Sequence, residues 1–472
     1  MGHHIINEVS QEKFEFTGRS KIIAIGLFVV GAILAGIGAM DVKNNWDSIG
    51  HHATEEVHTD DALEAHGEAG HGDHHATLAQ DEHGHSGEAT KGIHSDANHH
   101  GESADGHHGP TWMSRVWANL LMNSYYFWLF SVAAVFFIAV NYVANAGWAV
   151  MLKRVMEAQS SYLLVGSILL FGIILGAKDT LYHWVQYFSN PEAPTDAILE
   201  SKAWLLNSFS LFVIIPAILI TWILIRMKLR RNSVAEDDDK GLSMFRNSTR
   251  WSAGFIFFFA FSFSALSWLI IMSIDAHWYS TMFSVYNFAI SFVTGLSVMM
   301  VITQYLKSKG YMEMVSDEVV HDLGKFMFAF CIFWGYIFLS QWLLIWYTNL
   351  PEETAYFDAR LQGGYKTLFA INIFMCFLAP FLVLMMRNAK RYPKVLLTAA
   401  AIILIGHWVD TYLLIMPGTV GDKAGIGMLE IGTTMAFAGI FIYVVLNSLS
   451  KANMYPINHP YVLESANHDV GP

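Results

Sequence analysis

The chain has 472 residues, of which 54% are hydrophobic and only 14% are charged. Soluble globular and disordered proteins carry about a quarter charged residues, so this composition excludes both classes. The 28 Lys and Arg stand against 40 Asp and Glu, which excludes a nucleic-acid partner, because phosphate binding needs clustered basic surface. Cys331 and Cys376 lie in apolar runs without haem-attachment or iron–sulfur spacing, so we expect them to be packing residues.

Membrane-spanning helices are the dominant pattern along the chain. A helix needs about 20 mostly apolar residues to cross the hydrocarbon core of a bilayer. The sequence therefore predicts an all-α integral membrane protein with about ten transmembrane helices. The ten segments are 22–40, 126–143, 162–182, 204–225, 251–274, 280–305, 326–346, 367–386, 395–416 and 428–448.

The positive charges predict the orientation of these helices. Short cytoplasmic loops retain Lys and Arg. With the N-terminus placed inside, the inner segments hold 20 of these cations and the outer segments hold 8. Residues 1–21 and 451–472 are therefore both predicted to be cytoplasmic. The charged leader is long and no A-x-A cleavage site follows 22–40, so this first span is predicted to be an anchor.

Residues 41–112 form a low-complexity loop that this topology places in the periplasm. From Asp41 to Gly109 the loop holds 15 acids, 2 lysines and 14 of the 22 histidines. Such a composition cannot bury enough apolar surface to fold, which favours a solvated linker. Loose metal or proton buffering is a second interpretation, whereas no fixed spacing indicates a defined metal site. Adjacent histidines such as His51, His52, His74, His75, His99 and His100 could collect Zn²⁺, Cu²⁺ or Ni²⁺ in this loose way.

Ionisable residues within or beside the apolar spans form three clusters. A charge near the bilayer centre costs about 2.5 to 3.5 kcal/mol on insertion scales, so such residues indicate function. A second interpretation is that the residues at helix ends only anchor the helices in the interface, as Trp and Tyr do. The clusters are Lys178, Asp179 and His183 after the third span, Asp275 and His277 after the fifth span, and His407 and Asp410 in the ninth span.

The spacing within two clusters predicts how their side chains are arranged. Asp179 and His183 are four residues apart, which places them on one face of a helix within hydrogen-bonding reach. Asp275 and His277 are two residues apart and point to opposite sides of a helix. They can share a site only if the chain turns at this point.

The third cluster lies deeper in the membrane. His407 and Asp410 are three residues apart and share a helix face. At about 1.5 Å per residue they lie roughly 14 and 9 Å from the outer end of their span, in the periplasmic half. Gln341 in the seventh span lies at a comparable depth, about 8 Å from its outer end. Anchoring at the membrane interface explains His407 and Asp410 less well than it explains the other two clusters.

Asp/His pairs are suited to proton chemistry. The pKa of histidine is near 6.5, and removing a carboxylate from water raises its pKa toward this value. Such a pair can therefore take and pass protons near neutral pH. Quinol oxidation needs a base at the ring hydroxyls and apolar or aromatic walls. We expect Gln341, Trp408 and Tyr412 to complete a quinol pocket. The deep histidines are single, whereas a haem b between two spans needs a pair, so electrons would pass through a partner subunit.

Three long strings in the sequence resemble a known family. They are MSIDAHWYSTMFSVYNF, HDLGKFMFAFCIFWGYIFLSQWLLIWYTNLPEET and GHWVDTYLLIMPG. With the ten-span plan, they are similar to the ActF type of NrfD-like (polysulfide-reductase-type) membrane subunits. These subunits belong to bacterial alternative complex III, a quinol:cytochrome c or quinol:oxidase oxidoreductase. The family need not carry the His-rich insert.

The resemblance implies a fold. Two four-helix bundles, 113–279 and 280–416, would both start outside, as parallel repeats require. One helix would flank them at each end, at 22–40 and within 417–450.

The resemblance also implies a bacterial inner membrane, menaquinol or ubiquinol as the substrate, and no metal or covalently bound cofactor in this subunit. The partners would be an ActC-like homologue, an iron–sulfur subunit, cytochrome c subunits and a terminal oxidase. By motif, the three ionisable clusters match positions where the family places polar pocket or proton-path residues.

Three functions follow from these observations. The first is a quinol-oxidoreductase subunit that contributes a periplasmic quinol pocket, a proton pathway or both. The second is a structural and proton-conducting subunit that binds no quinone itself. The third is a secondary transporter, in which helix breaks are expected at matching places of both halves. Pro216 and Pro380, in the fourth and eighth spans, correspond in this way.

Overall fold

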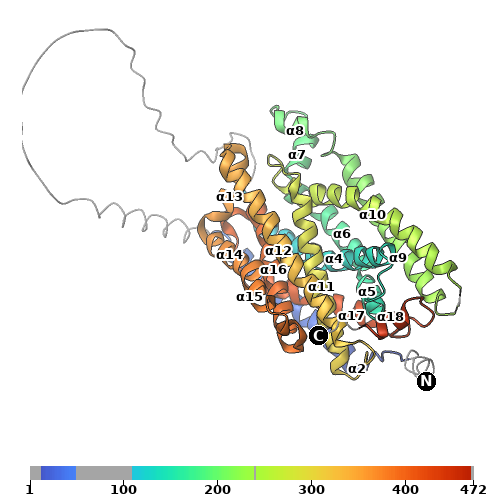
Figure 1. The fold of residues 1–472 in the computed structure, drawn as a ribbon. Coiled ribbons are helices and arrows are strands. Elements are labelled where there is room, and N and C mark those ends of the chain that lie inside the picture. The colour runs from blue at the N-terminus through green and yellow to red at the C-terminus, as the bar shows by residue number, and fades with distance from the viewer. Residues whose placement is uncertain (1–11, 49–108, 239–240, 469–472) are drawn as a thin grey trace, which may run out of the picture.

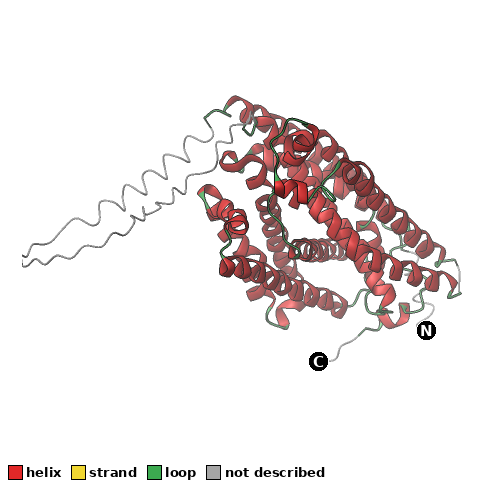
Figure 2. Cartoon of the chain, turned by 90° about the horizontal axis from the view of Figure 1, so that it is seen from above, coloured by secondary structure: helices red, strands yellow, loops and turns green. Residues whose placement is uncertain are grey.

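The computed structural model describes residues 12–48, 109–238 and 241–468. Helices joined by loops make up the described part of the chain (Figures 1 and 2). The β-type pairing there is one isolated bridge between Lys13 and Asn453. Among the described residues, ten helices are long and apolar enough to cross a membrane, so the predicted all-α ten-span fold is confirmed. The histidine pairs from His51 to His100 lie outside the described residues.

The ten spans follow one another along the chain, and several contain a change of helix type. They are α2 (Gly18–Asn44), α4 (Trp112–Val143), η1 with α5 and α6 (Val150–Leu152, Lys153–Gln159, Tyr162–Leu181), η2 with α9 (Ser210–Ile214, Ile215–Ala235), α10 with η3 (Ser243–Ile270, Met272–Ile274), α11 (Met282–Ser308), α12 (Asp317–Thr348), α14 with η4 and α15 (Gly363–Ile373, Phe374–Leu378, Ala379–Leu384), α16 with η6 (Pro393–Val420, Gly421–Lys423) and α17 (Met428–Leu449).

Short helices mark the two ends of this bundle (Figure 1). We call the end that carries α7 (His183–Ser189), α8 (Ala197–Ser201) and α13 (Pro351–Leu361) the α13 end. The opposite end carries the start of α2, η5 (Asn388–Arg391) and α18 (Val462–Ala466), and we call it the terminus end.

Three long helices, α4, α11 and α16, form the buried centre of the molecule. Helix α4 packs against α6 and α10, and α9 packs against α10. Helix α11 packs against α12 and α16, and the α14–η4–α15 span packs against α16. Contacts of α4 with α11 and α16 join these two groups of helices, so the most buried polar side chains of α16 lie at the heart of the fold.

Helices α2 and α17 form a closely packed pair at the side of the bundle. A Cβ atom added at Gly31 would lie 2.4 Å from the backbone nitrogen of Ala436, and one added at Gly432 would lie 2.3 Å from that of Ala35. Small residues at these positions let the two backbones approach, as in many membrane helix pairs. The other side of α2 exposes large apolar residues such as Ile22 and Met40, which suits contact with lipid.

The fourth and eighth spans share an irregularity. Each contains a five-residue π-helix, η2 and η4, and each has a proline two residues after it, Pro216 and Pro380 respectively. A proline has no N–H to donate to the carbonyl one turn earlier, which favours a local change of helix type. Pro216 and Pro380 thus occupy the same position relative to a π-helix, which agrees with their predicted correspondence.

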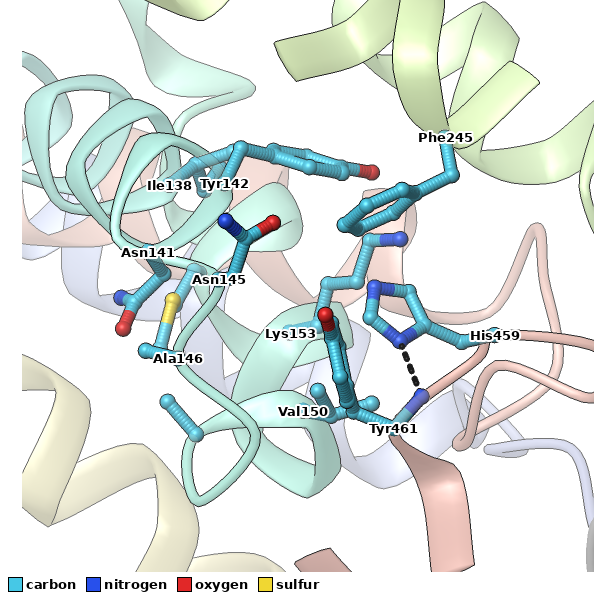
Figure 3. Close-up of a pocket in the computed structure, with 12 residues that line it drawn as sticks. Ile138, Asn141, Tyr142, Asn145, Ala146, Val150, Lys153, Phe245, His459 and Tyr461 are labelled. Atoms are coloured by element: carbon cyan, nitrogen blue, oxygen red, sulfur yellow. Dashed lines mark hydrogen bonds between the residues drawn. The ribbon is translucent and has the colours of Figure 1, made fainter. Parts of the chain in front are cut away.

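Buried charges collect at the terminus end. Lys153 Nζ lies 2.8 Å from a carboxylate oxygen of Glu236 and 4.8 Å from the ring centre of Tyr142. Figure 3 shows Tyr142, Lys153, Phe245 and His459 around a small cavity of about 30 Å³. The chain after α17 covers this cluster, because His459 contributes its ring to the cavity wall. This segment therefore depends on a buried imidazole for its packing.

Acid is expected to destabilise this end of the protein. Burial, helped by the positive charge of Lys153, lowers the pKa of His459 to about 2, whereas an unfolded histidine titrates near 6.5. Below pH 6.5 the unfolded chain therefore binds a proton that the folded chain lacks. Stability should then fall by about 1.4 kcal/mol for each pH unit, or roughly 2 kcal/mol at pH 5.

Thermal unfolding of the purified protein at pH 7.5 and pH 5 measures this effect. The wild type should lose more stability between the two values than His459→Asn does. An equal loss in both proteins would show that His459 does not carry the pH dependence.

Candidate functional site

The most buried ionisable pair lies near the middle of α16. His407 is 0% exposed and Asp410 is 1% exposed. Helix α16 runs from Pro393 to Val420, so at 1.5 Å per residue His407 lies about 20 Å from either end and Asp410 about 15 Å from the α13 end. The predicted distances of 14 and 9 Å were counted from Met416, whereas α16 continues to Val420.

Asp410 accepts hydrogen bonds from three other helices. Its Oδ1 accepts from the hydroxyl of Tyr286 on α11 at 2.5 Å and from Nδ2 of Asn372 on α14 at 3.0 Å. Its Oδ2 accepts from Nε1 of Trp334 on α12 at 3.0 Å and lies 3.1 Å from Nδ1 of His407. A carboxylate offers about four lone-pair positions, and these four groups occupy them. The charge is thus solvated by protein dipoles in an apolar bundle.

His407 has one partnered and one unpartnered nitrogen. Donation from Nδ1–H to Asp410 leaves Nε2 as a bare acceptor, and this buried atom has no hydrogen-bond partner in the described part of the chain. The Trp334 ring packs edge-on against the imidazole, with 5.4 Å between ring centres. The pair was predicted to share a helix face, and the contact between them confirms this prediction.

Cys376 adds a third potential metal ligand, although we expected it to be a packing residue. Its Sγ donates to Oδ1 of Asn372 at 2.9 Å and lies 3.5 Å from Nδ1 of His407. Ligand atoms of Cys376, His407 and Asp410 lie within 4.8 Å of one another, the one such group among the residues described. Both carboxylate oxygens and the thiol already have hydrogen-bond partners, which leaves Nε2 of His407 as the one unpartnered ligand atom of the group. The group fits proton holding better than metal binding.

A second polar group lies at the α13 end. Arg360 is 3% exposed and donates from NH2 to Oδ2 of Asp275 at 3.0 Å. Its Nε donates to the carbonyl of Leu413 on α16 at 2.9 Å, three residues beyond Asp410. The guanidinium lies over the ring of Tyr356, which stacks on Trp278. An ordered charge pair therefore connects this end of the fold with α16.

The chain turns at Asp275 and His277 as predicted, but the two side chains have different partners. Asp275 pairs with Arg360, whereas His277 Nε2 lies 2.6 Å from a carboxylate oxygen of Asp196. Both residues line one cavity of about 400 Å³, together with His183. Neither contacts the Asp410 network, which lies deeper along α16.

The prediction that Asp179 and His183 share one helix face was wrong. Helix α6 ends at Leu181, and Tyr182 is extended with φ −111° and ψ 93°, so His183 begins a new helix, α7. His183 instead faces His277, with 6.2 Å between ring centres. Asp179 pairs with its neighbour Lys178 at 2.7 Å on the surface, as expected for interface anchoring.

The predicted quinol-pocket residues do not gather around Asp410. Trp408 and Tyr412 lie about 100° or more around the helix from His407, because each residue turns an α-helix by that angle. Trp408 Nε1 donates to Oγ1 of Thr434 on α17 at 2.9 Å, and Tyr412 lines a separate cavity of about 280 Å³. Gln341 donates to Oγ of Ser280 at 3.1 Å, nearer the α13 end.

Sequence reasoning missed Tyr286, Trp334 and Asn372. Each stands singly in an apolar span, where aromatic and amide residues are also found in ordinary packing. One available signal was the spacing of Asn372 and Cys376, which are four residues apart and therefore on one face of the eighth span.

Comparison of the chain with protein-family models and with curated proteins finds no match.

Proposed function

We propose that this chain is a membrane subunit of a respiratory quinol oxidoreductase of the alternative complex III type, and that His407 and Asp410 hold and pass protons within it. The observation that carries the proposal is the Asp410 carboxylate, buried near the middle of a ten-helix bundle and surrounded by four hydrogen-bond donors. Placing an ionisable pair this deep in a membrane protein costs free energy, and packing alone does not require such residues.

The pair can change its protonation state without moving far. Asp410 and His407 share one hydrogen bond. The bare Nε2 can take up a proton, and the Nδ1 proton can then move to the carboxylate, which leaves a neutral imidazole beside a protonated Asp410. The other donors, Tyr286, Trp334 and Asn372, keep the carboxylate in place during this exchange. The proposal assigns proton handling to this pair, and not quinol binding, because both side chains are fully buried.

The rest of the proposal follows the resemblance. The α13 end would face the periplasm of a bacterial inner membrane, with both chain termini in the cytoplasm. The cavity beside Asp275 and Arg360 would be the outer end of the proton route. Electrons from menaquinol or ubiquinol would pass through an iron–sulfur subunit and cytochrome c subunits, beside an ActC-like homologue and a terminal oxidase.

A secondary transporter is the second candidate. The π-helices before Pro216 and Pro380 interrupt corresponding spans, and repeats with broken helices are typical of transporters. Reconstituted protein that moves protons or a solute without any quinol would support this candidate instead.

The proposal is tested with His407→Gln in the assembled complex. Removing the imidazole leaves Asp410 without its proton partner, so quinol-dependent proton release in sealed vesicles should fall at least tenfold. A pH-sensitive dye measures it. His468→Gln, at the terminus end, is the matched control because His468 pairs with Asp322 far from Asp410. Wild-type turnover and proton stoichiometry in His407→Gln would remove the pair from the mechanism.

A further inference from the structure

A proline interrupts the backbone hydrogen bonds near the end of α16. Pro417 lies inside this helix, which runs from Pro393 to Val420. A proline has no N–H, so the carbonyl four residues earlier, that of Leu413, lacks its usual backbone donor. Leu413 is buried, and a buried carbonyl without a donor destabilises a fold. The carbonyl of Leu413 therefore needs a donor from another part of the chain.

Arg360 supplies this donor. Its Nε donates to the carbonyl oxygen of Leu413 at 2.9 Å, and its NH2 donates to that of Leu414 at 3.3 Å. Arg360 belongs to the last turn of α13, so the donor comes from a different helix. The guanidinium thus takes the place of the backbone N–H that Pro417 lacks.

The guanidinium of Arg360 is held on all of its nitrogens. Its NH1 donates to the carbonyl of Tyr356 at 2.6 Å, and its NH2 also donates to Oδ2 of Asp275 at 3.0 Å. Arg360 is 3% exposed, so its charge is balanced by Asp275 and not by water. A Cβ atom added at Gly418 would lie 2.5 Å from Oδ1 of Asp275. The glycine next to Pro417 therefore lets this carboxylate approach α16.

The anchored part of α16 lies close to the buried proton pair. Leu413 follows Asp410 by three residues, which is about 4.5 Å along the helix axis. The groups that contact the Asp410 carboxylate lie 2.5 to 3.1 Å from it, and three of the four come from other helices. Contacts of this length depend on where α16 lies, and a misplacement of about 1 Å can cost about 100-fold in rate.

We infer that Arg360 is a positioning residue: it replaces the missing N–H of Pro417 and so fixes α16 where Asp410 meets its donors. The planar fork of Arg suits this role, because it directs several N–H groups at fixed angles toward carbonyl and carboxylate oxygens, whereas a Lys ammonium is a compact point charge. The hydrogen bonding concerns the fold alone. The effect on proton transfer rests on the proposed function.

The hydrogen-bonding part is tested by thermal unfolding of the full-length protein in detergent. Arg360→Met removes the donor of the Leu413 carbonyl and should lower the unfolding temperature. Pro417→Ala returns a backbone N–H to this carbonyl, so the double variant Arg360→Met/Pro417→Ala should recover at least half of the loss, beyond any effect of Pro417→Ala alone. No loss in Arg360→Met, or no recovery in the double variant, would overturn the inference.

Pro216→Ala is the matched control, because it also removes a proline from a membrane helix but offers no N–H to Leu413. Arg360→Met/Pro216→Ala should show no recovery beyond the effect of Pro216→Ala alone, and equal recovery with both prolines would contradict the inference. If Arg360→Met does not accumulate, the same cycle is run with Arg360→Lys, which keeps a charge beside Asp275 but loses the fork.

Quinol-dependent proton release in sealed vesicles, normalised to the amount of assembled protein, tests the positioning role. It should fall about tenfold in Arg360→Met and return to within about threefold of the wild type in Arg360→Met/Pro417→Ala. A double variant that regains stability but not proton release would overturn this role. If His407→Gln keeps wild-type proton release, the proposed function fails, and the unfolding cycle alone then decides whether Arg360 replaces the N–H of Pro417.

Discussion

Replacing Asp410 by Asn is expected to lower the quinol-dependent turnover of the proposed oxidoreductase complex by about 100-fold, at the lower end of what a positioned proton-transfer group contributes. Asn has nearly the same shape, but it cannot take up a proton. Its amide would also place a donor opposite Trp334 Nε1–H or the Tyr286 hydroxyl, which now donate to Asp410. Turnover is measured in membranes with saturating quinol, after immunodetection shows that the complex is assembled.

Thr411→Val is the matched control for this variant. Thr411 is adjacent on α16, is fully buried, and donates only to the carbonyl of His407 at 2.8 Å. Its replacement changes the packing volume little, so turnover should stay within about twofold of the wild type. Wild-type turnover in Asp410→Asn would exclude Asp410 as a proton carrier, and equal losses in both variants would point to packing instead.

Replacing Glu430 by Ala is expected to destabilise the protein by about 3 to 5 kcal/mol, the usual cost of removing one partner of a buried ion pair. Glu430 is fully buried at the start of α17, where its Oε1 accepts from Nε of Arg115 at 3.0 Å and from Nδ2 of Asn119 at 2.8 Å. Its Oε2 accepts from the N–H of Gly427 at 2.8 Å. The substitution leaves Arg115 charged and buried.

Thermal or denaturant unfolding in detergent measures this loss, and the double variant Arg115→Met/Glu430→Met is its control. Replacing both charges by apolar side chains of similar size removes the unpaired guanidinium, so the double variant should be more stable than Glu430→Ala. A double variant that is less stable than the single variant would show that the hydrogen bonds of Arg115 to the carbonyls of Lys423 and Gly425 matter more than its charge.

The sequence by itself determined the features that depend on local composition and spacing. Ten apolar segments long enough to cross a bilayer, the turn at Asp275 and His277, and the shared face of His407 and Asp410 were all readable from it. These features follow from the hydrogen-bonding needs of the backbone in lipid and from the 3.6-residue turn of the helix. They required no knowledge of which helices are neighbours.

Only the tertiary structure decided what surrounds each polar side chain. Tyr286 and Asp410 are 124 residues apart, yet they share a hydrogen bond, while Trp408, next to His407 in sequence, donates to a different helix. A membrane helix is apolar on every side, because lipid is as apolar as a neighbouring helix, so its hydrophobic pattern does not indicate which face meets the protein. The composition of the Asp410 network therefore depends on helix packing.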